Sequence, residues 1–61
     1  MKTYTIEFYD HADQKADLTF SIDDTLDNAK EQVKNLLVGA TNYAYAMVVS
    51  PKGYNVHIVK P

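Results

Sequence analysis

Apolar residues in the middle of the chain recur at steps of three and four, which is the period of an amphipathic helix. The stripe consists of Leu26, Ala29, Val33, Leu36, Leu37 and Ala40. Asp24 or Thr25 precedes it with a side-chain oxygen that suits a helix cap, and Gly39 suits a left-handed end. The pattern therefore predicts a helix from about residue 24 to 38, with one apolar face that needs a sheet to cover it.

On both sides of this helix, apolar and polar residues alternate, which is the period of a half-buried strand. The four alternating segments are residues 2–9, 15–22, 43–50 and 54–60. The first two flank a short polar loop and predict a hairpin. The last two flank Pro51-Lys52-Gly53 and predict a second hairpin, in which Gly53 takes the left-handed position of the turn.

These elements predict an α+β fold of the order ββαββ in a single domain, residues 1–61. We expect one four-stranded mixed sheet made of two hairpins, with the helix packed on one face. The hairpins are expected to meet through the first and last strands, which the helical crossover would make parallel. The element order and lengths resemble the immunoglobulin-binding domains of streptococcal protein G over nearly the whole chain. The resemblance, which includes no shared sequence motif, implies only a topology, and antibody binding is not carried over.

The second turn sets the register of the second hairpin. A three-residue turn at 51–53 would pair Ser50 with Tyr54. The pairs that follow are Val48 with Val56, Ala46 with Ile58, Met47 with His57, and Tyr45 with Val59. Val56 and Ile58 are the expected core residues of the last strand, so Ala44, Ala46 and Val48 would share their side of the sheet.

The opposite side of that hairpin would then be unusually apolar for a solvated sheet face. The predicted protein-binding residues are Tyr43, Tyr45, Met47, Val49, His57 and Val59. Tyr and Met are enriched at interfaces, and a contiguous apolar patch is typical of one. Residues 43–50 are also expected to form an edge strand, open to pairing with a partner. The alternatives are ordinary surface exposure, or a register shifted by one that turns the set inward.

Charge and composition narrow the classes of function. Eight acidic residues and six lysines give a net charge of −2, without arginine or cysteine. Scattered lysines without arginine argue against nucleic-acid binding, so Tyr4 and Tyr54 are expected in the core rather than against bases. The absence of cysteine excludes disulfides and thiolate zinc sites. Without a signal-peptide pattern or a long apolar run, we expect a cytoplasmic protein that does not contact membranes.

Three groups of polar residues have both a chemical and a structural interpretation. They are Asp10 with His11 and Asp13, Asp23 with Asp24 and Asp27, and His57 with Ser50 or Tyr45. The first group contains metal-ligand types, but Asp is common in turns because it bonds its own backbone. Helix-start electrostatics explain the second, and the third lacks a group to orient the histidine. We therefore expect no catalytic residue, metal or cofactor.

The expected function is that of a small non-enzymatic protein-binding module. It would be an inhibitor or adaptor of the phage-encoded type that acts on a host protein through the second hairpin. One alternative is a structural homodimer formed through the exposed sheet face or the edge strand. Another is a weak nucleic-acid-binding protein. An enzyme is the least expected class, since a small domain has little room for a pocket that excludes water.

Overall fold

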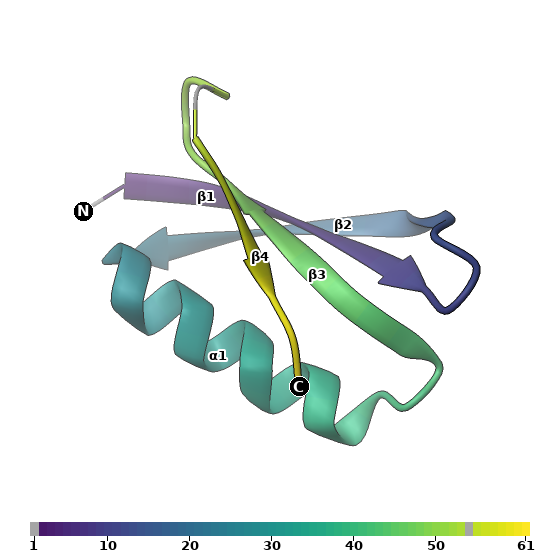
Figure 1. Ribbon diagram of the computed structural model, residues 1–61. Helices are drawn as coiled ribbons and strands as arrows, with labels where there is room; N and C mark the ends of the chain where they lie inside the picture. Colours follow the sequence, from purple (N-terminus) through teal and green to yellow (C-terminus); the bar gives the residue numbers. More distant parts are fainter. Residues whose placement is uncertain (1, 54) are drawn as a thin grey trace.

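A computed structural model describes residues 2–53 and 55–61 of the chain. Its helix lies across one face of a single sheet (Figure 1). The elements are β1 (Lys2–Asp10), β2 (Lys15–Asp24), α1 (Leu26–Gly39), β3 (Tyr43–Val49) and β4 (Val56–Val59). The predicted α+β class, the ββαββ order, the four-stranded sheet and the single covered face are confirmed.

The order of strands in the sheet is β2-β1-β3-β4, and every neighbouring pair is antiparallel. The predicted mixed sheet, with the first and last strands side by side and parallel, is therefore wrong. β2 and β3 do run in the same direction, as expected of strands joined through a helix, but β1 lies between them. The prediction placed β4 next to β1, whereas β3 occupies that position.

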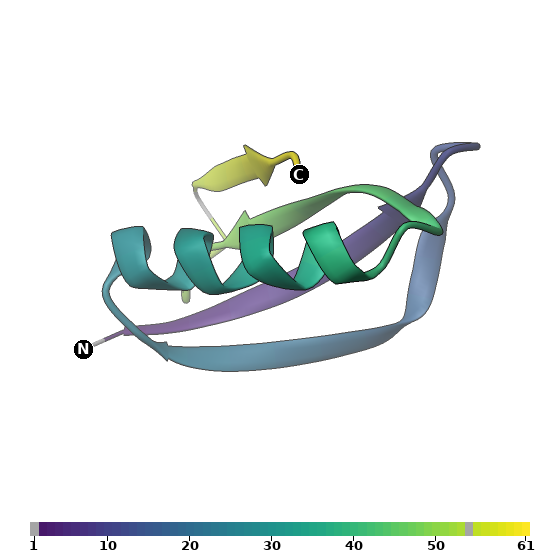
Figure 2. The same cartoon turned by 90° about the horizontal axis from the view of Figure 1, so that it is seen from below.

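β3 takes the inner position because both of its sides are apolar. Every residue of Tyr43–Val49 is at least partly buried, whereas Val56 and Ile58 of the short β4 are 50% and 58% exposed. A long apolar strand buries more surface between two neighbours than at an edge, and short strands suit edges. β2 and β4 accordingly form the two edges of the sheet (Figure 2), and the prediction that residues 43–50 form an edge strand is wrong.

The core lies between α1 and the inner sides of β1 and β3. Its largest fully buried side chains are Ile6, Leu37, Val33 and Val48. Ala29 of the helix and Ala46 of β3 are also fully buried, and small side chains there let the helix lie close to the sheet. The predicted helix stripe is confirmed except at Leu36, which is 47% exposed, and at Ala40, which lies just beyond the last helical residue. A helix turns by about 100° per residue, so Leu36 lies at the margin of the stripe, beyond the part that the sheet covers.

Side-chain hydrogen bonds fix the start of α1, where capping by Asp24 or Thr25 was predicted. Thr25 is the N-cap, and its Oγ1 accepts a hydrogen bond from the Asn28 N–H at 3.3 Å. Asp24 accepts from the Thr25 N–H at 2.7 Å, from Asn28 Nδ2 at 3.0 Å and from Gln32 Nε2 at 3.3 Å. These bonds, above all the one from the Asn28 side chain, lower the pKa of Asp24 below its ordinary value of 3.8.

The end of α1 differs from the prediction. Gly39 is the last helical residue, but the positive φ angles among the described residues belong to Asp13 and Gly53. The Ala40 N–H instead donates to the carbonyl oxygens of Leu36 and Leu37, at 3.0 and 3.2 Å. These bonds satisfy the last turn of the helix without a left-handed residue.

Replacing Asp24 by asparagine is expected to lower the free energy of unfolding near neutral pH. Because the folded state lowers the pKa of this carboxyl, its stabilising contribution is present above about pH 4 and is lost as the pH falls through the folded-state pKa. Urea unfolding of the wild type and of Asp24→Asn, from about pH 7 to about pH 2, measures the difference. A difference that stays constant over this range would contradict the assignment.

Candidate protein-binding surface

The loop between β3 and β4 is one residue longer than predicted. The Ser50 N–H donates to the Asn55 carbonyl oxygen at 2.9 Å, and the Asn55 N–H donates to Ser50 Oγ at 3.1 Å. Ser50 therefore pairs with Asn55 and not with Tyr54, whose predicted core position lies outside the described residues. Gly53 has a φ of 74°, which confirms its predicted left-handed conformation.

This longer loop moves β4 by one residue against β3. The observed pairs are Ala46 with Val59, Met47 with Ile58, Val48 with His57, and Val49 with Val56. Because successive residues of a strand point to opposite faces, a shift of one exchanges the two faces. The predicted core residues Val56 and Ile58 therefore point away from the helix. The predicted surface residues His57 and Val59 lie on the helix side, where Val59 is buried.

Tyr43 also departs from its predicted place on the outer side. The pairing of β1 with β3 shifts between Tyr9 and Asp10, so the alternation of β3 is interrupted near its start. Tyr43 packs against the buried core, with its ring centroid 5.2 Å from that of Phe8. Of the predicted face, Tyr45, Met47 and Val49 remain on the outer side.

We call the apolar residues that do share the outer side of β3 and β4 the outer patch. It consists of Tyr45, Met47, Val49, Val56 and Ile58. The pairs Val49–Val56 and Met47–Ile58 make it continuous across the two strands. The outer side of the first hairpin is polar, as predicted, with pairs such as Thr5–Ser21 and Glu7–Thr19. One half of this sheet face is therefore apolar and the other half is polar.

An aromatic pair borders the outer patch on its β1 side. The rings of Tyr9 and Tyr45 are stacked, with centroids 5.0 Å apart and planes 3° from parallel. The Tyr45 hydroxyl donates to Asp13 Oδ1 at 3.0 Å. Desolvation, followed by this hydrogen bond and the nearby negative charge, raises the pKa of Tyr45 above its ordinary value. Tyr45 is thus a neutral donor held in one orientation by the β1–β2 loop.

β4 is a free edge of the sheet, and its outward backbone groups belong to Val56 and Ile58. In an antiparallel ladder, hydrogen-bonded pairs alternate with pairs that exchange no hydrogen bonds. Ser50 and Asn55 form a hydrogen-bonded pair. The pair Val49–Val56 therefore exchanges no hydrogen bonds, and the next hydrogen-bonded pair is Val48–His57. The N–H and C=O groups of Val56 and Ile58 therefore point to the open edge, beside the outer patch.

Hydrogen bonds within the fold account for the polar groups considered in the sequence. Asp10 Oδ1 accepts from the N–H groups of Ala12 and Gln14, and His11 Nε2 lies 3.0 Å from the Thr41 carbonyl oxygen. These bonds order the β1–β2 loop and tie it to the loop before β3. Residues 2–53 and 55–61 contain no group of three His, Cys, Asp or Glu side chains that could hold a metal ion.

At the start of the helix, Thr3 donates a hydrogen bond to Asp23, and Asp24 supports the cap as described above. His57 faces the helix side beside Val48, whereas Tyr45 lies on the outer side, so strand pairing places these two predicted neighbours on opposite faces. The local hydrogen bonds do not account for the outer patch or for the open β4 edge.

Comparison of the chain with protein-family models, with curated proteins and with solved structures finds no match. Among the described residues, α1 is too short and too polar to cross a membrane.

The assignment of faces in β4 predicts opposite effects for neighbouring substitutions. Val59→Asp places a carboxylate in the core and is expected to lower the free energy of unfolding by about 3 kcal/mol or more. Ile58→Asp places the same group in water and is expected to change it by less than about 1 kcal/mol. Thermal or urea unfolding of both variants measures the contrast. The reverse order of stability would restore the register predicted from the sequence.

Proposed function

We propose that this chain is a non-enzymatic protein-binding module that acts through the outer patch. In this proposal it occupies a surface of its partner, as an inhibitor or adaptor does. The observation that carries the proposal is the continuous apolar strip on a sheet face whose other half is polar. Val56 and Ile58 at its margin are 50% and 58% exposed, which is unusual for aliphatic side chains on an open sheet face.

The composition of the outer patch supports contact with protein. It combines an aromatic ring, a methionine and three aliphatic side chains, and aromatic residues and methionine are enriched in interfaces. The stacking of Tyr45 on Tyr9 and its bond to Asp13 hold the aromatic ring in place before any partner arrives. A side chain that is already ordered loses little conformational freedom on binding, which favours affinity.

A second copy of the chain is the alternative partner for the outer patch. Two outer patches could pack back to back, which would bury Val56 and Ile58 in a symmetric interface. This alternative rests on the same apolar surface and predicts a different readout, which is a mass that rises with protein concentration.

Charge placed in the outer patch is expected to abolish partner capture while the fold survives. Met47→Lys tests this, because Met47 pairs with Glu7 across the sheet and a lysine there remains solvated. Thr19→Lys is the matched control, because Thr19 flanks Glu7 on the polar half of the same face and gives the same change in charge. Quantitative capture from a lysate, with circular dichroism as a check of folding, compares the two variants with the wild type.

We expect the wild type and Thr19→Lys to retain the same protein from the lysate. The amount of this protein that Met47→Lys retains is expected to be lower by about tenfold or more. Equal capture of every protein by all three chains would contradict the proposal. Sedimentation over a concentration series separates the homodimer: a wild-type dimer that Met47→Lys dissociates would assign the outer patch to a second copy.

A further inference from the structure

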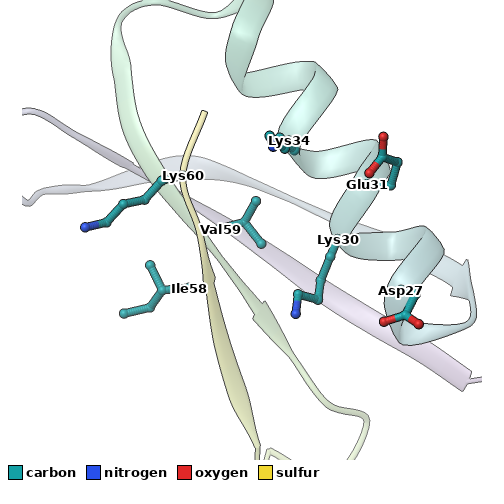
Figure 3. Close-up of a pocket in the computed structure, with 7 residues that line it drawn as sticks. All are labelled: Asp27, Lys30, Glu31, Lys34, Ile58, Val59 and Lys60. Atoms are coloured by element: carbon teal, nitrogen blue, oxygen red, sulfur yellow. The ribbon is translucent and has the colours of Figure 1, made fainter.

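A groove runs between α1 and β4, next to the open edge of the sheet. Residues of α1 between Asp27 and Lys34 form one wall and the end of β4 forms the other. Val59 points from β4 toward the helix, whereas Ile58 and Lys60 point to the opposite side of the strand (Figure 3). Lys30 extends from the helix toward β4 in the same view. The edge of β4 thus has two different sides, an apolar outer one and a charged one along the groove.

Positive charge gathers around this edge. Four of the six lysines lie near β4: Lys30 and Lys34 extend from the helix wall of the groove, Lys60 follows β4, and Lys52 belongs to the β3–β4 loop, where it lines a hollow with Lys2 of β1. Asp27 and Glu31 are the acidic residues that line the groove. The one ion pair among the described residues joins Lys15 to Glu7 at 3.6 Å, so the four lysines near β4 take part in no ion pair there.

The rest of the molecule carries the opposite charge. The other six acidic residues belong to β1, β2 and the loop between them. They are Glu7, Asp10, Asp13, Asp17, Asp23 and Asp24. The net charge of −2 therefore conceals a positive β4 side and a negative β2 side. Electrostatic complementarity of this kind selects partners and orients them more than it adds affinity.

We propose that the β4 edge binds an extended peptide segment as a fifth strand, and that this segment alternates aliphatic and acidic residues. The outward N–H and C=O groups of Val56 and Ile58 would pair with the backbone of the segment. Its aliphatic side chains extend the outer patch, and its acidic side chains lie along the groove near Lys30 and Lys34. This inference rests on the proposed protein-binding function and adds the chemistry of the bound segment.

The same charges disfavour the pairing of two β4 edges with each other. Antiparallel pairing of two copies would bring together two edges that each carry Lys60 at one end and Lys52 at the other. Like charges at a shared interface oppose association. The β2 edge disfavours an acidic segment, because β2 carries Asp17, Asp23 and Asp24 and like charges oppose association. An acidic peptide at β4 is thus the occupant that the charges favour.

The probe for this proposal is a synthetic six-residue peptide that alternates valine and glutamate, with its ends acetylated and amidated. Addition of this peptide to isotope-labelled protein is expected to slow amide hydrogen exchange at Val56 and Ile58 by about tenfold at saturation, because these N–H groups become hydrogen-bonded. A matched peptide with lysine in place of glutamate is expected to leave both exchange rates unchanged. Nuclear magnetic resonance reports exchange and affinity together.

Two single substitutions that alter the net charge by the same amount test whether the lysines near the groove attract the peptide. Lys30→Glu is expected to weaken binding of the glutamate peptide by about threefold to tenfold, and Lys15→Glu at the far edge by less than about twofold. Equal weakening by both, or equal binding of the two peptides, would overturn the charge preference. Peptide shifts confined to Met47 and Tyr45, without slower exchange at Val56 and Ile58, would overturn strand addition and leave the outer patch as a binding surface.

The remaining outcomes also decide the proposal. An absence of any peptide effect at millimolar concentration would overturn the fifth strand, while the Met47→Lys capture experiment judges the outer patch independently. A mass that rises with protein concentration in the absence of peptide, together with slower amide exchange at Val56 and Ile58 at high concentration, would assign the β4 edge to another copy and overturn the peptide as its occupant.

Discussion

The packing of α1 on β1 and β3 is the contact on which the rest of the fold depends. Val33 of the helix, Ile6 of β1 and Val48 of β3 are fully buried where these three elements meet. A domain of this size buries only about 60% of the surface that its unfolded chain exposes, so it has one core and a small margin of stability. That core fixes which side of the sheet is inside. Every conclusion about the outer side follows from it.

One consequence is the asymmetry between the two hairpins. The first places polar side chains on the outer side, while the second fills its inner strand with apolar residues on both sides. The helix covers one side of β3, whereas Met47 and Val49 on the other side are only partly buried, next to the exposed Val56 and Ile58 of β4. The result is a face that is half polar and half apolar, next to an edge strand of four residues.

The distribution of charge distinguishes the β4 side of the sheet from the β2 side. Four of the six lysines lie near β4, and six of the eight acidic residues belong to β1, β2 and the loop between them, although the sequence intersperses the two signs. The fold sorts them because the helix turns Lys30 and Lys34 toward β4, while Lys60 follows the same strand. Apolar surface, open backbone groups and positive charge therefore coincide at one edge, and the proposed binding mode combines the three.

Much of this architecture was predicted from local pattern. The periods of two and of three to four located all five elements, and the side-chain oxygens of Asp24 and Thr25 marked the start of the helix. Tyr45, Met47 and Val49 were placed on the outer side correctly, because their own strand alternates regularly from Tyr45 onward. Tyr43 was not, because the irregular pairing at Tyr9 and Asp10 leaves no signal in the sequence.

The strand order of the sheet and the register of the second hairpin depend on the tertiary structure. Both strands of the second hairpin are apolar enough to lie next to β1, and only the burial of β3 on both sides decides between them. The turn after Ser50 fits three residues or four equally well by composition, yet the extra residue exchanges Val56 and Ile58 with His57 and Val59. The sequence by itself determined the elements and their order, since these depend on neighbours in the chain. Strand order and register depend on contacts between distant segments, and these contacts decided which residues the protein presents.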